Sequence, residues 1–103
     1  VYGSKATERK VYVGKCMKYF SKLGVTEFLI ENVDLHVGDK ILVTGETTGA
    51  LIQTVDEIRY DLKPVDTATR GQRISIKTNE KVRPNDKLYV LEKTIREGLD
   101  NKK

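Results

Sequence analysis

Cys16 and His36 are the two side chains in this sequence best suited to nucleophilic or metal chemistry. A thiolate and an imidazole serve as nucleophile, general base or metal ligand, but each residue type occurs only once here. A zinc site needs three or four ligands that converge, and no ligand spacing pattern surrounds these two residues. Cys16 also lies in an apolar run, where a buried and inert thiol is the usual occupant. We therefore predict no metal site, no cofactor and no Cys–His nucleophile pair.

Two other features resemble catalytic motifs only superficially. Residues 45–49 form a glycine-bounded loop, but the loop lacks the Gly-Lys-Ser/Thr ending and precedes a predicted strand instead of a helix. The acidic pair Asp56 and Glu57 shows nothing that marks a general acid and base. The sequence accordingly predicts that this chain alone is not an enzyme. No residue pattern in the chain supports a hydrolase.

The basic residues are concentrated at one end of the chain. Residues 1–22 hold six basic side chains and one acidic one, whereas residues 23–103 hold 13 basic and 14 acidic side chains. A localised basic surface attracts phosphate, and interleaved aromatic rings can stack on bases. We therefore predict a nucleic-acid-binding set, with Tyr12 and Phe20 as neighbouring rings, made of Lys10, Lys15, Lys18, Tyr19 and Lys22. Two alternatives stay open: the lysines protect a solvated strand edge, and the rings pack in a barrel wall.

Three turn-then-strand units organise the rest of the chain. Glycine-containing turns at 37–39 and 70–72, and a turn at 84–86, each precede a short segment with two alternating apolar residues, at 40–44, 73–78 and 87–92. Further strands are predicted at 10–20, 25–31 and 50–60, with a short return passage at 65–69. The fold class is therefore all-β, a small closed or partly open antiparallel barrel of six or seven strands.

Two of these strands should be irregular. The apolar alternation of the first strand changes parity at Gly14, which indicates a bulge or a close backbone approach. In the segment 50–60, Leu51 and Val55 share one parity while Ile58 takes the other, so a kink is expected near Asp56. Both features are typical of strands that turn a barrel corner.

The ends of the chain look different from the barrel. Residues 1–9 are polar and aperiodic and are predicted to form a linker or frayed arm before the barrel domain at 10–92. Thr94 and Glu97 form a capping-box pair, so residues 93–103 are predicted to be a short helix and polar tail. The first residue is Val1, which suggests an excised or processed piece. A single cysteine and the absence of a long apolar run favour a cytoplasmic location without membrane association.

Several runs of residues resemble known families. The second, β-barrel domain of translation GTPases such as elongation factor Tu is similar at 13–15, 35–43 and 68–74. The C-terminal barrel of the collagenase-like peptidases, family thirty-two of the unknown-type (U) class, resembles this chain more closely, at 19–25, 47–49, 61–65 and 81–89. One departure is Glu46, where that family leads us to expect proline and hence a more rigid loop.

The resemblance implies a parent protein whose larger N-terminal domain carries the activity. Members of the family are named peptidases, and several are linked to hydroxylation of transfer or ribosomal RNA. The implied partners are therefore the N-terminal catalytic domain and, through it, RNA; no catalytic motif of the family maps onto this chain. We expect a non-catalytic accessory barrel that helps to position RNA or a protein partner. The alternatives are a structural module that packs on its own catalytic domain and exposes an apolar patch when isolated, or a free-standing translation-factor-like RNA- or ribosome-binding protein.

Overall fold

The computed structural model describes the backbone of residues 5–96 and the side chains of residues 8–92. Within this range the chain forms ten β-strands, and all of their pairings are antiparallel. The strands are β1 (Lys5–Phe20), β2 (Val25–Ile30), β3 (Leu35–His36), β4 (Lys40–Gly45), β5 (Gly49–Thr54), β6 (Ile58–Tyr60), β7 (Lys63–Val65), β8 (Thr67–Ala68), β9 (Arg73–Lys77) and β10 (Lys87–Arg96).

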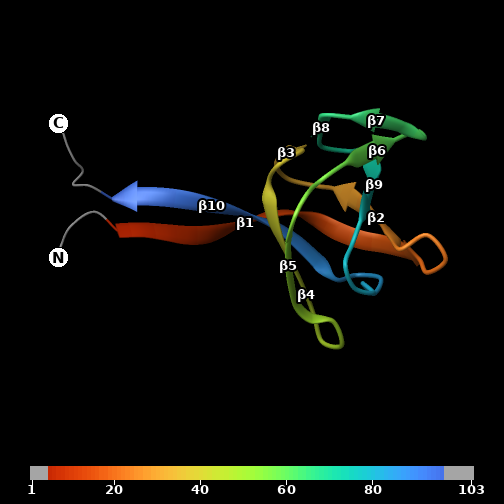
Figure 1. The fold of residues 1–103 in the computed structure, drawn as a ribbon, viewed down its shortest axis with the longest axis horizontal. Helices are drawn as coiled ribbons and strands as arrows, with labels where there is room; N and C mark the ends of the chain where they lie inside the picture. Colours follow the sequence, from red (N-terminus) through yellow and green to blue (C-terminus); the bar gives the residue numbers. More distant parts are fainter. Residues whose placement is uncertain (1–4, 97–103) are drawn as a thin grey trace.

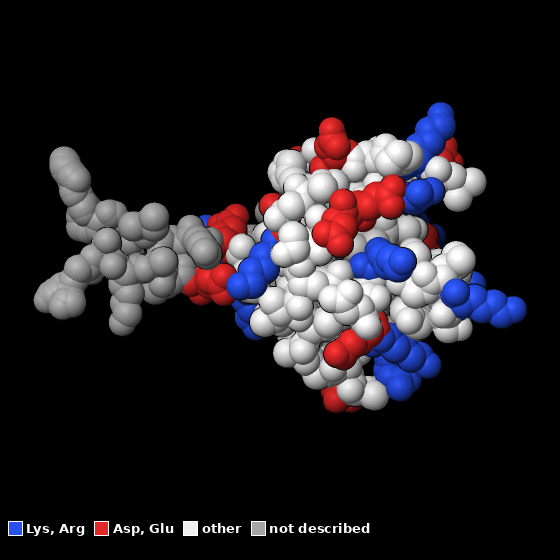
Figure 2. Space-filling view, in the orientation of Figure 1, with Lys and Arg blue, Asp and Glu red and all other residues white. Residues whose placement is uncertain are grey.

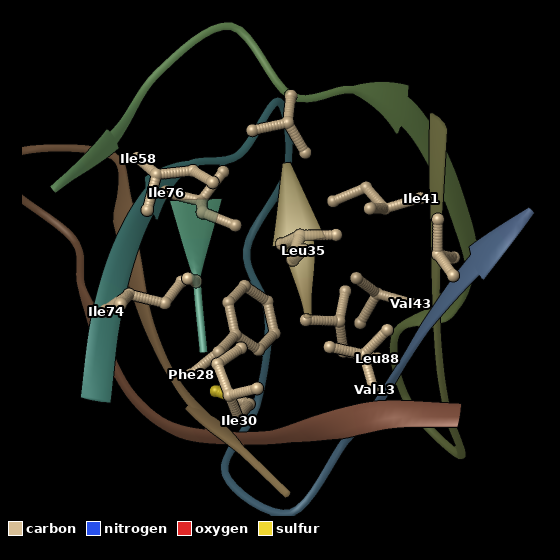
Figure 3. Close-up of a cluster of buried hydrophobic side chains, with 14 of the residues drawn as sticks. Val13, Phe28, Ile30, Leu35, Ile41, Val43, Ile58, Ile74, Ile76 and Leu88 are labelled. Carbon is tan, nitrogen blue, oxygen red and sulfur yellow. The ribbon is translucent and has the colours of Figure 1, made fainter. Parts of the chain in front are cut away.

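Eight strands make one curled sheet in the order β5-β4-β10-β1-β2-β9-β6-β7, and β3 pairs with β8 beside it (Figure 1). Side chains from opposite parts of this sheet, among them Phe28, Ile74, Val43 and Leu88, point into one apolar interior around Leu35 (Figure 3). Each of these five side chains is fully buried. The predicted all-β antiparallel barrel is therefore confirmed, and the extra strands are segments of two or three residues, too short to show a period in the sequence.

A side chain connects the edge strand β5 to β9, the third strand from the other edge of the sheet. Gln53 lies on the edge strand β5; its Nε2 donates to the Lys77 carbonyl at 2.8 Å, and its Oε1 accepts from the Asn79 amide at 2.8 Å. In addition, the amide of Val37 in the β3–β4 turn donates to the carbonyl of Asp66, which follows the other edge strand β7, at 2.9 Å. The barrel is thus closed by an amide side chain and a turn instead of a continuous backbone ladder.

Both predicted irregularities are present. The register of β1 against β10 shifts between Tyr12 and Gly14, and a Cβ on Gly14 would lie 1.8 Å from the carbonyl oxygen of Leu29. Gly14 therefore marks a bulge and also a close backbone approach. The expected kink near Asp56 breaks the predicted strand 50–60 into β5 and β6.

The ends of the described chain differ from the sequence prediction. Residues 5–9, expected in a linker or arm, belong to β1, and residues 93–96, expected to begin a helix, belong to β10. Thr94 pairs with Thr7 across this ladder instead of capping a helix, while Glu97 lies outside the described residues. The two strands leave the barrel as a ribbon (Figure 1) because each supplies the hydrogen bonds of the other, a long-range pairing that local capping signals do not reveal.

Between residues 5 and 96, the structure contains no helix long and apolar enough to cross a membrane.

Candidate nucleic-acid interface

Two bulges in β1 bring Lys10, Lys15 and Lys18 to the same outer face of the barrel. Residues an odd number of positions apart lie on opposite faces of a regular strand. Lys10 and Lys15 are five positions apart, and the register shift between Tyr12 and Gly14 returns Lys15 to the face of Lys10. Lys15 and Lys18 are three positions apart, and a second shift between Cys16 and Lys18 returns Lys18 to the same face. The three lysines consequently remain at least partly exposed.

The other two predicted residues lie elsewhere. Tyr19 pairs directly with Thr26, whose side chain is fully buried. Because residues directly opposite in an antiparallel pair share a face, Tyr19 lies on the inward parity and not beside the lysines. Lys22 is exposed in the turn between β1 and β2. The structure therefore groups three of the five predicted residues.

Neighbouring strands add apolar side chains to this outer face. Tyr12 of β1 pairs with Tyr89 of β10, Tyr89 pairs with Leu42 of β4, and Leu42 pairs with Ile52 of β5. The two tyrosine rings meet edge to face, with centroids 5.8 Å apart. Ile52 at the end of the series is 54% exposed. We call these four residues the apolar row; it crosses four strands.

Lysines lie on both sides of the apolar row. On one side, Lys15 and Lys87 are directly opposite each other, an arrangement in which like charges repel. On the other side, the Nζ of Lys10 lies 4.7 Å from the centroid of the Tyr89 ring, and the Nζ of Lys40 lies 3.0 Å from Glu8 Oε2. A bound anion near Lys15 and Lys87 would relieve their repulsion.

Glu31 is an acidic residue that contacts the apolar row. It accepts a hydrogen bond from the hydroxyl of Tyr12, and its Oε2 lies 4.0 Å from the Nζ of Lys15. Burial, together with the hydrogen bond and charge of Glu31, raises the pKa of Tyr12 to about 12. Tyr12 thus keeps its proton at neutral pH and remains a hydrogen-bond donor.

Sequence reasoning missed the partners contributed by β4, β5 and β10. Lys87 and Tyr89 alternate with the buried residues Leu88 and Val90, so their outward direction could have been read from the period of two. Their neighbours on β1 lie more than 70 positions earlier in the chain. No local pattern reveals that contact.

Cys16 and His36 have separate surroundings. Cys16 is 1% exposed, and burial raises the pKa of its thiol to about 11, so the thiol is protonated at neutral pH. His36 is exposed on β3, with its Nδ1 3.6 Å from Asp39 Oδ2. Among the described residues, no three His, Cys, Asp or Glu side chains are grouped as metal ligands.

The fold is that of a known domain type. Two crystal structures of the C-terminal domain of a Geobacillus thermoleovorans protein of the U32 peptidase family, one in its selenomethionine form, superpose on this chain with a TM-score of 0.72. They cover 76% and 77% of this chain, and 96% and 90% of their own chains, at 16% and 17% sequence identity. The barrel therefore has the fold of a U32 C-terminal domain.

Curated proteins with a similar sequence match this chain at higher identity than the two crystal structures do. It is 63% identical over 92 residues to a collagenase of Porphyromonas gingivalis strain W83, a match that covers 89% of this chain and 22% of the relative. It is 34% identical over 95 residues to an uncharacterized protease of Methanocaldococcus jannaschii, covering 92% of this chain and 23% of that protein. No family model matches the chain.

The homologues of this chain are thus members of the collagenase and U32 peptidase family, which confirms the predicted resemblance to that family. The chain spans about a quarter of the length of these curated relatives.

Proposed function

We propose that this barrel is a non-catalytic, C-terminal accessory domain of a U32 peptidase homologue, and that its lysine-flanked outer face positions RNA for a catalytic domain outside this chain. The observation that carries the proposal is the pair of bulges in β1. They direct Lys10, Lys15 and Lys18 to the outer side of the sheet, with Lys10 and Lys15 beside the tyrosines of the apolar row.

The chemistry of this face suits a flexible polyanion. Lysine ammonium groups bind phosphates as point charges, and exposed parts of tyrosine rings stack on unpaired bases. Each phosphate contact with a single strand contributes about −0.7 to the slope of log K against log salt concentration. Binding through three lysines should therefore weaken steeply as salt rises, and it should show little preference for sequence.

The test is a fluorescence titration of the barrel with bulk transfer RNA and ribosomal RNA at about 50 mM and about 200 mM salt. A triple variant, Lys10→Gln with Lys15→Gln and Lys18→Gln, should weaken binding at the lower salt by about tenfold or more and flatten the salt slope by about 2. The reason is the loss of three phosphate contacts.

A matched control makes the same change in net charge elsewhere. Lys63, Lys77 and Lys81 are exposed on β7, β9 and the β9–β10 loop, outside the strands β1, β10, β4 and β5 that form the proposed face. Their triple change to glutamine should alter affinity by less than about threefold. Equal losses in the two triple variants would contradict a localised site, and absence of binding at low salt would remove RNA from the proposal.

A further inference from the structure

A groove of about 880 Å³ lies at the end of the barrel away from the β1–β10 ribbon. The outer faces of β2, β9 and β6 form its floor, and the β1–β2 and β6–β7 turns stand on either side of it (Figure 1). This groove is separate from the apolar row. Its apolar wall residues are Leu23, Tyr60 and Leu62.

Packing within the barrel does not explain why a leucine occupies position 62. Tyr60 pairs with Lys63, so Asp61 and Leu62 form a two-residue hairpin turn, and their φ angles are 55° and 67°. Two positive φ angles define a type I′ turn, which favours Asn-Gly because a leucine Cβ is strained in this region. The Leu62 side chain is nevertheless 90% exposed. The left-handed backbone at Leu62 therefore lowers the stability of the barrel, and the side chain gains little packing within the barrel to offset this.

A second exposed leucine stands on the other side of the groove. Leu23, in the β1–β2 turn, is 67% exposed, and Tyr60 beside Leu62 is 40% exposed. Single exposed apolar residues are common on protein surfaces. Three that line one concave surface are typical of an interface.

The charged side chains that line the groove are balanced, three acidic and three basic, and the exposed lysines beside it, Lys22 and Lys63, add a positive surplus at its rim. Arg73 is paired with Glu27 at 3.2 Å, and Arg59 with Glu57 at 3.3 Å. Within the described residues, no carboxylate lies within 4.0 Å of the Lys77 ammonium. Lys and Arg also gather on this side of the molecule in Figure 2, around the two turns, where Lys22 and Lys63 adjoin the leucines.

We propose that this groove holds an acidic polypeptide segment from the rest of the same protein, with an apolar side chain of that segment placed between Leu62 and Leu23. Two of the three exposed apolar wall residues, Leu23 and Leu62, are aliphatic. They favour a polypeptide over a nucleic acid, because bases stack on rings and a phosphate placed against leucines would lose its hydration without gaining a partner. The positive surplus favours acidic neighbours on the segment.

The length of the relatives identifies the source of the segment. This chain matches 22% of the Porphyromonas gingivalis collagenase, so most of such a polypeptide lies outside the barrel. A tethered segment binds at a high effective concentration, which suits a shallow groove with few anchors. The inference rests on the proposed position of the barrel beside a catalytic domain, but it does not rest on RNA binding.

The experiment measures thiol accessibility in the isolated barrel and in the full-length protein, without RNA. Leu62→Cys introduces a thiol at the groove, and native Cys16 contributes little background because it is 1% exposed. Maleimide labelling at residue 62, followed by peptide mass spectrometry, should be about tenfold or more slower in the full-length protein. A matched control, Ile52→Cys on the apolar row, should label equally in both proteins. Equal labelling of residue 62 in both would overturn the proposal.

A second variant tests the anchor without disturbing the fold. Leu62→Asn tolerates the left-handed backbone, so the isolated barrel should be at least as stable toward urea as the wild type. In the full-length protein, the same change should speed labelling of a Leu23→Cys reporter to the rate seen in the isolated barrel. Unchanged protection of residue 23 would overturn the role of Leu62.

The remaining outcomes are also decisive. If the isolated barrel itself protects residue 62 as its concentration rises, the occupant is a second copy and the proposal is wrong. If residue 62 is protected in the full-length protein while the RNA titration shows no binding, the groove is supported and the RNA proposal fails. Protection that requires added RNA would contradict the groove proposal.

Discussion

At the scale of single residues, Cys16 shows how burial removes chemistry from a reactive side chain. Its thiol lies in the apolar core and its backbone joins two segments, with the amide donating to the Asp86 carbonyl at 2.8 Å. Burial, followed by the negative charge of Asp86, raises the thiol pKa from its ordinary value of 9.0 to about 11. Cys16 therefore acts as a small apolar residue at neutral pH.

This pKa shift makes the stability of the barrel depend on alkaline pH. Between pH 9 and about pH 11 the unfolded chain has lost the thiol proton while the folded chain still holds it. Since stability falls with pH wherever the unfolded state binds fewer protons, the stabilisation present below pH 9 should be lost across this window. Urea unfolding at several pH values should therefore show the free energy of unfolding of the wild type falling more steeply than that of Cys16→Ala.

The comparison with Cys16→Ala also isolates the thiol from other groups. Tyr12, whose pKa is raised to about 12, titrates in both proteins and cancels in the difference. The cavity left by alanine lowers stability by an amount that does not depend on pH. Parallel stability curves for the two proteins would show that the thiol titrates alike in the folded and unfolded chains.

At the scale of elements, local signals were predictable and long-range contacts were not. The turn at Gly38 and the bulge at Gly14 follow from residues adjacent in sequence, and both are present. The pairing of Thr7 with Thr94 depends on a partner 87 positions away, so residues 5–9 and 93–96 were wrongly predicted to belong to a linker and a helix. Likewise, the first strand supplied three lysines of the candidate site, whereas its partners on β4, β5 and β10 required the sheet order.

The contact of Gln53 with the end of β9 is another long-range feature that follows from the order of the strands and not from local sequence. The Gln53 amide bridges β5 to the end of β9 with two hydrogen bonds of 2.8 Å. Gln53→Leu removes both, and at about 1 kcal/mol for each bond the free energy of unfolding should fall by about 2 kcal/mol. Gln53→Glu keeps the acceptor for the Asn79 amide but loses the donor to Lys77, so its loss should be smaller.

Urea unfolding tests the predicted loss of stability, and amide hydrogen exchange tests the predicted loss of the hydrogen bond. The exchange rate of the Asn79 amide should rise in Gln53→Leu more than in Gln53→Glu, because only the first variant removes its acceptor. Thr54→Ala, at an exposed neighbouring position on β5, serves as the control and should change stability by less than about 0.5 kcal/mol. A Gln53→Leu barrel as stable as the control would mean that the backbone contact between Val37 and Asp66 closes the barrel unaided.

At the scale of the whole molecule, charge distribution matters more than the net charge of +4. Most acids near the proposed RNA face are already paired: Glu8 with Lys40 at 3.0 Å and Glu92 with Arg9 at 3.1 Å. Glu31 is different because it contacts both the apolar row, through Tyr12, and Lys15. Its charge opposes a phosphate at the position where the proposed site would bind one.

Removing this charge should therefore strengthen RNA binding. Glu31→Gln keeps an acceptor for the Tyr12 hydroxyl and frees Lys15, so affinity at low salt should rise by about three- to tenfold, with a salt slope steeper by about 0.7. Glu80→Gln makes the same charge change on an exposed loop residue and should have a smaller effect. The measurement is the RNA titration used for the lysine variants. Equal gains in the two variants would mean that RNA responds to the overall charge of the domain and not to the face formed by β1, β10, β4 and β5.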